Sequence, residues 1–389
     1  MHTFFRAISV KILSALTLSA LALTAPAASA QTAPVLHGDT ALMSRQLLFS
    51  GGDGVSKFYR IPALVTTPTG RLVALADRRL TSNKDLAAPI DVVCRYSDDN
   101  GQTWSPQVVV AANDSVGGYG DAVLGVAPGG DLVAVMAHGQ GFWESDSLDR
   151  IRVCLSRSAD GGQTWSAPAD MTDCIYSPTP GVAPVRAYAA FGTSGRMLTD
   201  RNGTMWFVLV ARPHKAKYSA AACHACFSTD GGRTWQSQPV AVDTDADESR
   251  IVECADGSLL VSIRNRQRGW RKFARSTDGG RTWVPAQVSA TLPDPACNGS
   301  VIRTADGLLL HTVPADHADR YNVSLFYSRD NGNTWHKSLR LCPVRSAYSD
   351  ITEMADGNLA VLTEEASSAG GMRIWLNVLD RKKCPGLNP

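Results

Sequence analysis

The chain has 389 residues, and its 38 lysines and arginines nearly balance its 36 aspartates and glutamates, which leaves a formal net charge of +2. This balance excludes a whole-molecule attraction to nucleic acid or to an anionic membrane surface, so any charge selectivity has to be local. The sequence contains no Ser- or Pro-rich linker and no low-complexity tract, which favours one folded module over several.

Residues 1–30 have the layout of a secretory signal peptide. Arg6 and Lys11 accompany a short apolar run, and the small residues Ala28-Ser29-Ala30 precede the predicted cleavage point. A transmembrane anchor is the alternative, but the apolar run is too short and is interrupted by Ser and Thr. The residue after the cut is Gln and not Cys, so no lipid anchor is indicated. We expect an exported protein, periplasmic or extracellular, whose mature domain is 31–389.

An eight-residue pattern, S-x-D-x-G-x-T-W, occurs five times along the mature chain at intervals of about 50 to 70 residues. The copies begin at Ser97, Ser158, Ser228, Ser276 and Ser328. Ser and Asp can bond to nearby backbone groups, Gly supplies the positive φ of a tight turn, and Trp is an apolar plug beneath it. Short runs rich in β-formers, such as Ile90–Cys94, come before the turns. Each copy therefore predicts a corner between two strands.

A second repeat counts the structural units. A Gly followed shortly by an apolar strand occurs six times, at Gly70, Gly130, Gly203, Gly257, Gly307 and Gly357. The first five each precede one octapeptide, whereas the sixth lies close to the end of the chain. We therefore expect the N-terminal strand near Gln46–Phe49 to return and complete the last unit. The prediction is an all-β, six-bladed β-propeller with four-stranded antiparallel blades and five octapeptide turns.

The octapeptide resembles the Asp-box of sialidases and other Asp-box propellers, which is specific for architecture and silent about chemistry. Tyr59-Arg60-Ile61-Pro62 resembles the (F/Y)RIP motif of sialidases, although by itself it reads as a surface arginine before an edge strand. Together the motifs identify the chain as similar to bacterial secreted exo-α-sialidases over essentially all of the mature region. This resemblance implies a monomeric glycoside hydrolase that releases terminal sialic acids from glycoproteins, glycolipids and oligosaccharides, with no cofactor, metal, nucleic acid or membrane span.

Sialic acid carries a carboxylate on its anomeric carbon, and a guanidinium group offers charged, bidentate recognition of that carboxylate. The family uses three arginines for this purpose. The matching residues are Arg60, Arg264 in Ser262-Ile-Arg264-Asn265 and Arg320 in Asp319-Arg320-Tyr321-Asn322. Competing candidates for the second and third positions are Arg266, Arg268 and Arg303.

The resemblance also implies the catalytic residues, which are Asp85 as general acid, Tyr348 as nucleophile and Glu248 as the base that assists it. A carboxylate nucleophile would be repelled by the carboxylate of the substrate, whereas a neutral phenol is not. A phenol has a pKa of about 10 and needs a base to take its proton as it attacks. A general acid has to keep its proton at working pH, which desolvation by the bound substrate favours. The rival to Asp85 is Asp91, which reads as part of a strand, and Glu253 lies near Glu248.

Four further contacts follow from the resemblance. Arg79 matches a contact to the hydroxyl side of the sugar, and Asp121 matches the carboxylate that meets the N-acetyl N–H, with Ala122 where a proline is often found. Trp143 is a candidate wall for the acetyl methyl group, although packing is its simpler interpretation. Glu364 matches the carboxylate that orients the first arginine. The neighbouring Glu365 is the alternative, and Thr363 stands where the family often has Tyr.

Nine cysteines in an exported chain permit up to four disulfides, with a pairing that the sequence does not determine. Cys223-His-Ala-Cys226 looks like half of a zinc site, but no second half lies nearby, so a structural thiol or disulfide is expected. Four other functions stay open. They are a non-catalytic sialic-acid-binding propeller, a glycanase acting on neutral polysaccharide, a trans-sialidase and a hydrolase of deaminated sialic acid.

Overall fold

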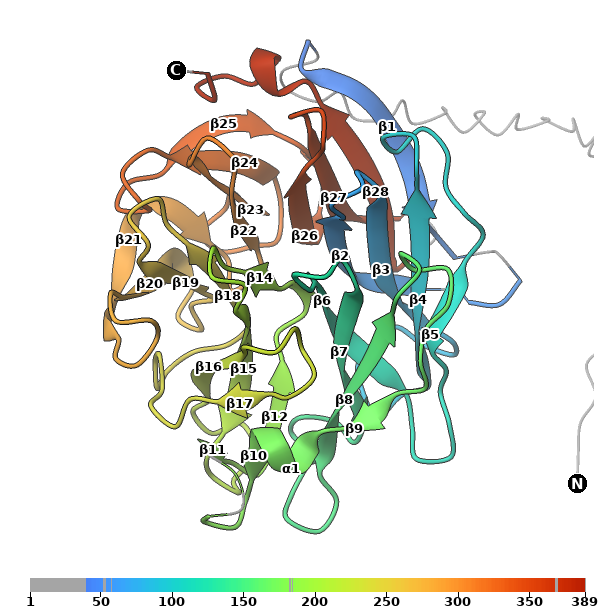
Figure 1. The fold of residues 1–389 in the computed structure, drawn as a ribbon, viewed down its shortest axis with the longest axis vertical. Coiled ribbons are helices and arrows are strands. Elements are labelled where there is room, and N and C mark those ends of the chain that lie inside the picture. The colour runs from blue at the N-terminus through green and yellow to red at the C-terminus, as the bar shows by residue number, and fades with distance from the viewer. Residues whose placement is uncertain are drawn as a thin grey trace, which may run out of the picture. The chain divides into compact units, whose positions relative to one another are not determined.

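The computed structural model describes residues 40–51, 54–56, 58–181, 183, 185–367 and 370–388, so the predicted signal peptide lies outside the described residues. Six larger sheets stand around a common centre, as the ribbon shows (Figure 1). Each contains four antiparallel strands, which confirms the predicted six-bladed propeller. Within the described residues, none of the helices has the length and apolar character needed to cross a lipid bilayer.

The blades follow one another along the chain. Blade 1 is β2 (Phe58–Thr66), β3 (Leu72–Arg79), β4 (Ile90–Ser97) and β5 (Val108–Ala111). Blade 2 is β6 (Tyr119–Val126), β7 (Leu132–Gly139), β8 (Ile151–Ser158) and β9 (Ala169–Asp170). Blade 3 is β12 (Ala189–Gly192), β15 (Met205–Arg212), β16 (Ala222–Ser228) and β17 (Gln236–Ser237).

The second half of the ring has the same order. Blade 4 is β18 (Ser249–Glu253), β19 (Leu259–Ile263), β20 (Gly269–Ser276) and β21 (Val284–Asp294). Blade 5 is β22 (Ser300–Arg303), β23 (Leu309–Pro314), β24 (Val323–Ser328) and β25 (His336–Arg340). Blade 6 is β26 (Ser346–Glu353), β27 (Leu359–Ala366), β28 (Met372–Leu379) and β1 (Leu42–Phe49).

Short elements supplement the blades. Blade 2 gains β13 (Gly195–Arg196) on β6, blade 3 gains β14 (Leu198–Thr199) on β15, and β10 (Tyr176–Ser177) pairs with β11 (Val185–Arg186). The described helical segments are α1 (Thr172–Ile175) and the 3-10 turn η1 (Arg381–Lys383).

The N-terminal strand closes the ring as predicted. β1 pairs antiparallel with β28, from Leu42 opposite Leu379 to Phe49 opposite Ile374, and the two strands run side by side in blue and red in Figure 1. Apolar side chains of blades 6 and 1, including those of Leu362 and Leu64, join in one buried cluster. Because each blade packs between two neighbours, the hydrophobic core is divided among the interfaces between blades.

All five octapeptides form the predicted turns, each at the end of the third strand of its blade. In the copy that starts at Ser276, Ser276 Oγ donates to the carboxylate of Asp278 at 2.8 Å and accepts from the Gly280 N–H at 2.9 Å. The Thr282 N–H donates to the same carboxylate at 3.0 Å. In the first copy, the equivalent bonds from Thr103 lower the pKa of Asp99 to about 2. These contacts span at most four residues, so the turn is a local property of its sequence.

No disulfide links the nine cysteines, all of which lie in the described residues. Cys223 and Cys226 are three residues apart on β16, so their side chains lie on opposite faces of the strand, in different core clusters. The two thiols are therefore parts of separate core clusters and do not form half of a zinc site. The described residues also contain no group of three His, Cys, Asp or Glu side chains that is arranged to hold a metal ion.

Candidate active site

A pocket of about 360 Å³ lies where the blades converge, and all six blades contribute to its lining. Eight of the ten residues singled out from the sequence line it, namely Arg60, Asp85, Asp121, Trp143, Glu248, Arg264, Arg320 and Tyr348. Arg79 and Glu364 lie behind the surface, with side chains that are 1% and 0% exposed. Residues that are more than 280 positions apart in the chain, such as Arg60 and Tyr348, thus meet at one place.

Glu364 holds Arg60 in place. Arg60, near the start of β2, donates from Nε and Nη2 to the two carboxylate oxygens of Glu364 at 2.9 and 3.0 Å. Glu364 also accepts from the backbone N–H groups of Ile61 at 2.6 Å and Tyr348 at 3.1 Å. Burial opposes the charge on Arg60, but Glu364 raises the pKa of its guanidinium above the ordinary value. The neighbouring Glu365 accepts instead from Arg45 at 2.5 Å, so the two glutamates serve different arginines.

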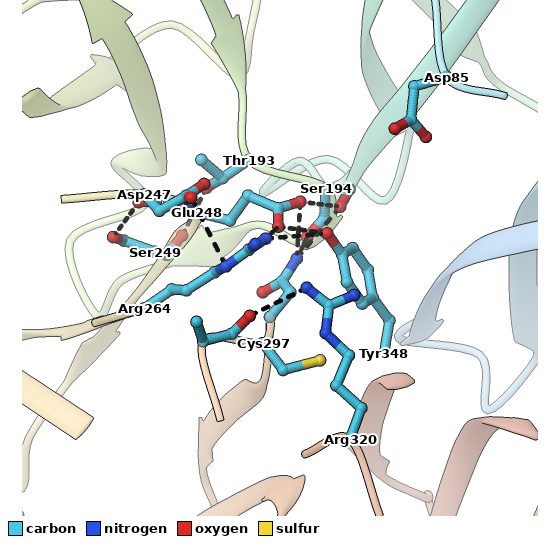
Figure 2. A network of polar contacts seen from close by, with 12 residues as sticks. Asp85, Thr193, Ser194, Asp247, Glu248, Ser249, Arg264, Cys297, Arg320 and Tyr348 are labelled. Atoms are coloured by element: carbon cyan, nitrogen blue, oxygen red, sulfur yellow. Dashed lines mark hydrogen bonds and ion pairs between the residues drawn. The ribbon is translucent and has the colours of Figure 1, made fainter. Parts of the chain in front are cut away.

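The pocket-lining residues Tyr348, Glu248 and Arg264 form a hydrogen-bonded group (Figure 2). The Tyr348 hydroxyl donates to Glu248 Oε2, and Arg264 Nη1 donates to the same carboxylate oxygen. Arg264 Nη1 also lies 3.2 Å from the Tyr348 hydroxyl. Burial and the charge of Glu248 raise the pKa of Tyr348 well above its ordinary value, although Arg264 and Arg320 oppose this shift. The phenol therefore keeps its proton at neutral pH, and a carboxylate acceptor is already in contact with it.

Arg320 completes the cationic side of the pocket. Its Nη2 donates to the carbonyl oxygen of Ala296 at 2.9 Å, and among the described residues no carboxylate forms an ion pair with it. The guanidinium carbons of Arg60 and Arg320 lie 5.2 and 5.7 Å from the centroid of the Tyr348 ring. Two guanidinium groups thus flank the phenol, and the charge of Arg320 is left to attract an anion.

Asp85 lies on the loop after β3 and stands apart from the Tyr348 group in Figure 2. Its side chain is 78% exposed, and its Oδ1 accepts from Arg79 Nη2 at 2.6 Å. Arg79 also donates to the carbonyl oxygen of Asn83 at 2.7 Å. The buried arginine therefore holds the loop of Asp85 in place, which sequence reasoning did not foresee.

The carboxylate of Asp77 on β3 was not predicted as part of the site. It is buried, accepts from the Asp121 N–H at 3.1 Å and lies 3.7 Å from Arg79 Nη2. Burial raises the pKa of Asp77 to about 7, although Arg79 opposes the shift, and burial together with Asp77 raises the pKa of Asp121 well above its ordinary value. The available signal was the spacing of Asp77 and Arg79, which places both side chains on one face of the strand.

The side of the pocket between blades 2 and 3 is apolar. Phe142 packs edge-on against Trp143 at 4.8 Å and against Phe191 at 5.4 Å between ring centroids. Of these rings only Trp143 was singled out from the sequence. The remaining lining residues that were not predicted are Ile61, Leu86, Glu144, Ile151, Val210, Ala221 and Asp247, while Arg266 had been considered only as a rival to Arg264. The pocket thus has a cationic side and an apolar side.

The fold and this pocket define an Asp-box β-propeller with an arginine-rich centre. Residues 70–361 match the family described as BNR repeat-like domain. The chain is 33% identical over 384 residues to a sialidase of Micromonospora viridifaciens. The aligned region covers 92% of this chain and 58% of that relative. It is 30% identical over 363 residues to sialidase-2 of Cricetulus griseus, which covers 84% of this chain and 90% of that relative.

Among solved structures, the Hadza microbial sialidase Hz136 matches with a TM-score of 0.75 and 28% identity, over 86% of this chain and 68% of that one. The chain belongs to the sialidase family of BNR-repeat proteins. It spans little more than half the length of the bacterial relative from Micromonospora.

Proposed function

We propose that the protein is an exo-α-sialidase, which removes terminal α-ketosidically linked sialic acids from glycoproteins, glycolipids and oligosaccharides. The observation that carries this proposal is the meeting of Arg60, Arg264 and Arg320 around a phenol, Tyr348, that is bonded to the carboxylate of Glu248. The similar proteins from Micromonospora viridifaciens and Cricetulus griseus support it, since both are sialidases.

In the first half of the reaction, the three guanidinium groups bind the substrate carboxylate. The Tyr348 oxygen attacks the anomeric carbon while Glu248 accepts its proton. The bond to the leaving oxygen breaks, and Asp85 gives that oxygen a proton. The product is a tyrosyl-sialyl intermediate and a released alcohol.

In the second half, Asp85 is ionised and takes a proton from water, whose oxygen attacks the anomeric carbon. The bond to Tyr348 breaks, and Glu248 returns the proton to the phenol oxygen. Two displacements at one carbon retain its configuration. Each proton-transfer step uses a carboxylate or phenol of this chain, so no cofactor is invoked.

The pocket also offers contacts for the N-acetyl group. Asp121 lines the pocket and offers a carboxylate acceptor for an amide N–H, and the adjoining rings of Trp143 and Phe142 offer an apolar surface for a methyl group. These contacts support N-acetylated sialic acid as the preferred substrate over the deaminated form.

A hydrolysis assay tests the proposal. We expect purified protein to release sialic acid from a 4-methylumbelliferyl sialoside, and proton NMR should show the α-anomer as the first product. Parallel assays with α2,3-, α2,6- and α2,8-linked substrates would define the linkage preference. Folded protein that binds sialic acid but releases none between acidic and neutral pH would support the non-catalytic glycan-binding propeller instead.

We also propose that the protein is exported after removal of residues 1–30. The charged start, the apolar run and the Ala28-Ser29-Ala30 sequence support this proposal. N-terminal sequencing of the protein from a secreting host should begin at Gln31. A mature chain that still begins at Met1 would contradict export by this route.

A further inference from the structure

The rim of the pocket beside blade 3 carries an aromatic side chain that the proposed reaction does not use. Tyr218 lies between β15 and β16, is 71% exposed, and has a backbone φ of 58°. A positive φ is uncommon and costly for tyrosine, so the surrounding contacts have to maintain it. The Tyr218 ring packs against Trp143 with centroids 5.1 Å apart, and Trp143 lines the pocket. The exposed ring therefore continues the pocket wall outward.

A buried arginine holds the two loops that carry this aromatic pair. Arg212, at the end of β15, donates to the carbonyl oxygens of Phe142 and Ser145 on the loop of Trp143. It also donates to the carbonyl oxygens of His214 at 2.9 Å and Lys215 at 2.7 Å on the other loop. Hydrogen bonds from a charged donor are stronger than neutral ones. The buried guanidinium group of Arg212 thus holds the two loops next to each other.

Two further contacts attach the loop of Tyr218 to the pocket lining. Lys217 Nζ lies 3.5 Å from Glu144 Oε1, and Arg266 Nη1 donates to the carbonyl oxygen of Ser219 at 3.2 Å. Glu144 and Arg266 both line the pocket. The residues on either side of Tyr218 therefore contact the pocket lining, while its ring remains open to solvent.

The proposed proton donor lies along the same rim. Asp85 is exposed. The carbonyl oxygen of its neighbour Leu86 packs so closely against Gly141 that a Cβ added to this glycine would lie 2.5 Å from that oxygen. A series of contacts thus connects Asp85, through its neighbour Leu86 and the loop of Gly141 and Trp143, to Tyr218. The leaving group of a sialoside has to reach the proton donor, so it lies outside the pocket, near this rim.

We propose that Tyr218, supported by Trp143, stacks against the pyranose ring of the sugar to which the sialic acid is attached. This inference rests on the proposed function, because it concerns the leaving group of that reaction. Tyrosine presents a large apolar face with a polar tip, which suits a sugar ring that has an apolar C–H face and polar edges. Because its loop is already held in place, binding requires little further ordering.

The test compares two substrates. The leaving group of 3′-sialyllactose is a disaccharide, whereas that of methyl α-sialoside contains no ring. We expect Tyr218→Ala to lower the ratio of kcat/KM for sialyllactose to kcat/KM for the methyl sialoside by about fivefold, mainly through KM. Tyr218→Phe keeps the ring and should keep the ratio. Val284→Ala, which trims an exposed apolar side chain on β21, is the matched control and should also keep it.

The outcomes separate this site from the proposed function. If Tyr218→Ala cleaves both substrates with an unchanged ratio, or loses activity equally on both, the stacking site is refuted and the sialidase proposal stands. If the wild-type protein cleaves neither substrate, the sialidase proposal fails, and saturation-transfer NMR decides on the stacking site. Galactose protons of 3′-sialyllactose should then receive saturation from the wild-type protein and not from Tyr218→Ala.

Discussion

Replacing Tyr348 with Phe should lower kcat for sialoside hydrolysis on the order of a thousandfold or more, because it removes the attacking oxygen. The substitution leaves the bidentate contact between Arg60 and Glu364 and the ion pair between Arg264 and Glu248 in place. Binding of free sialic acid should therefore change by less than about threefold, since the carboxylate-binding groups remain. Steady-state kinetics and calorimetric titration measure the two quantities.

Tyr96→Phe is the matched control for this experiment, because it removes a phenol hydroxyl from β4, where the ring packs against Arg71 outside the pocket. It should keep wild-type turnover. When the wild-type protein is mixed rapidly with a sialoside and then denatured, mass spectrometry should show that it has gained the mass of one sialyl residue. The Tyr348→Phe variant should show no such gain. Turnover near the wild-type level in Tyr348→Phe would remove Tyr348 from the nucleophile role.

Replacing Asp294 with Ala should lower the free energy of unfolding by about 3–5 kcal/mol, because it leaves the charge of Arg271 buried and unpaired. Both side chains are fully buried, and Arg271 Nη1 donates to Asp294 at 3.1 Å. Asp294 also accepts from the N–H groups of Asn265 and Cys297, both at 2.9 Å. Asn265 follows Arg264, and the residue before Cys297 supplies the carbonyl contact to Arg320. Because Asp294 thus supports the segments that position Arg264 and Arg320, its loss should also raise KM for a sialoside.

Urea denaturation followed by circular dichroism measures the change in unfolding free energy. Asp173→Ala is the control, because it breaks the 2.7 Å pair with Arg150, in which the carboxylate is 71% exposed, and should cost less than about 1 kcal/mol. If Asp294→Ala does not accumulate as folded protein, Asp294→Asn keeps one acceptor and should give an intermediate loss. If the Asp294 and Asp173 variants lose equal free energy of unfolding, the buried pair does not stabilise the fold more than the exposed pair.

Some features of the site could not be read from the sequence, because they depend on register and on neighbouring blades. The sequence favoured Glu364 and left the adjacent Glu365 as an alternative, and it is the pairing of β27 with its neighbours that brings Glu364 to Arg60. Asp77 was not predicted as a site residue, although it contacts the Asp121 backbone across a blade interface. Phe191 likewise joins the pocket wall only because blade 3 packs beside blade 2.

The sequence by itself determined the number of blades, the five octapeptide turns and the return of the N-terminal strand. These predictions succeeded because a turn such as Ser276 to Trp283 is stabilised by bonds within a few residues, so its residues dictate it locally. Only the tertiary structure decided which charged groups meet. Arg60 and Glu364 are 304 residues apart in the chain. They are in contact because the ring of blades closes and brings blade 6 beside blade 1.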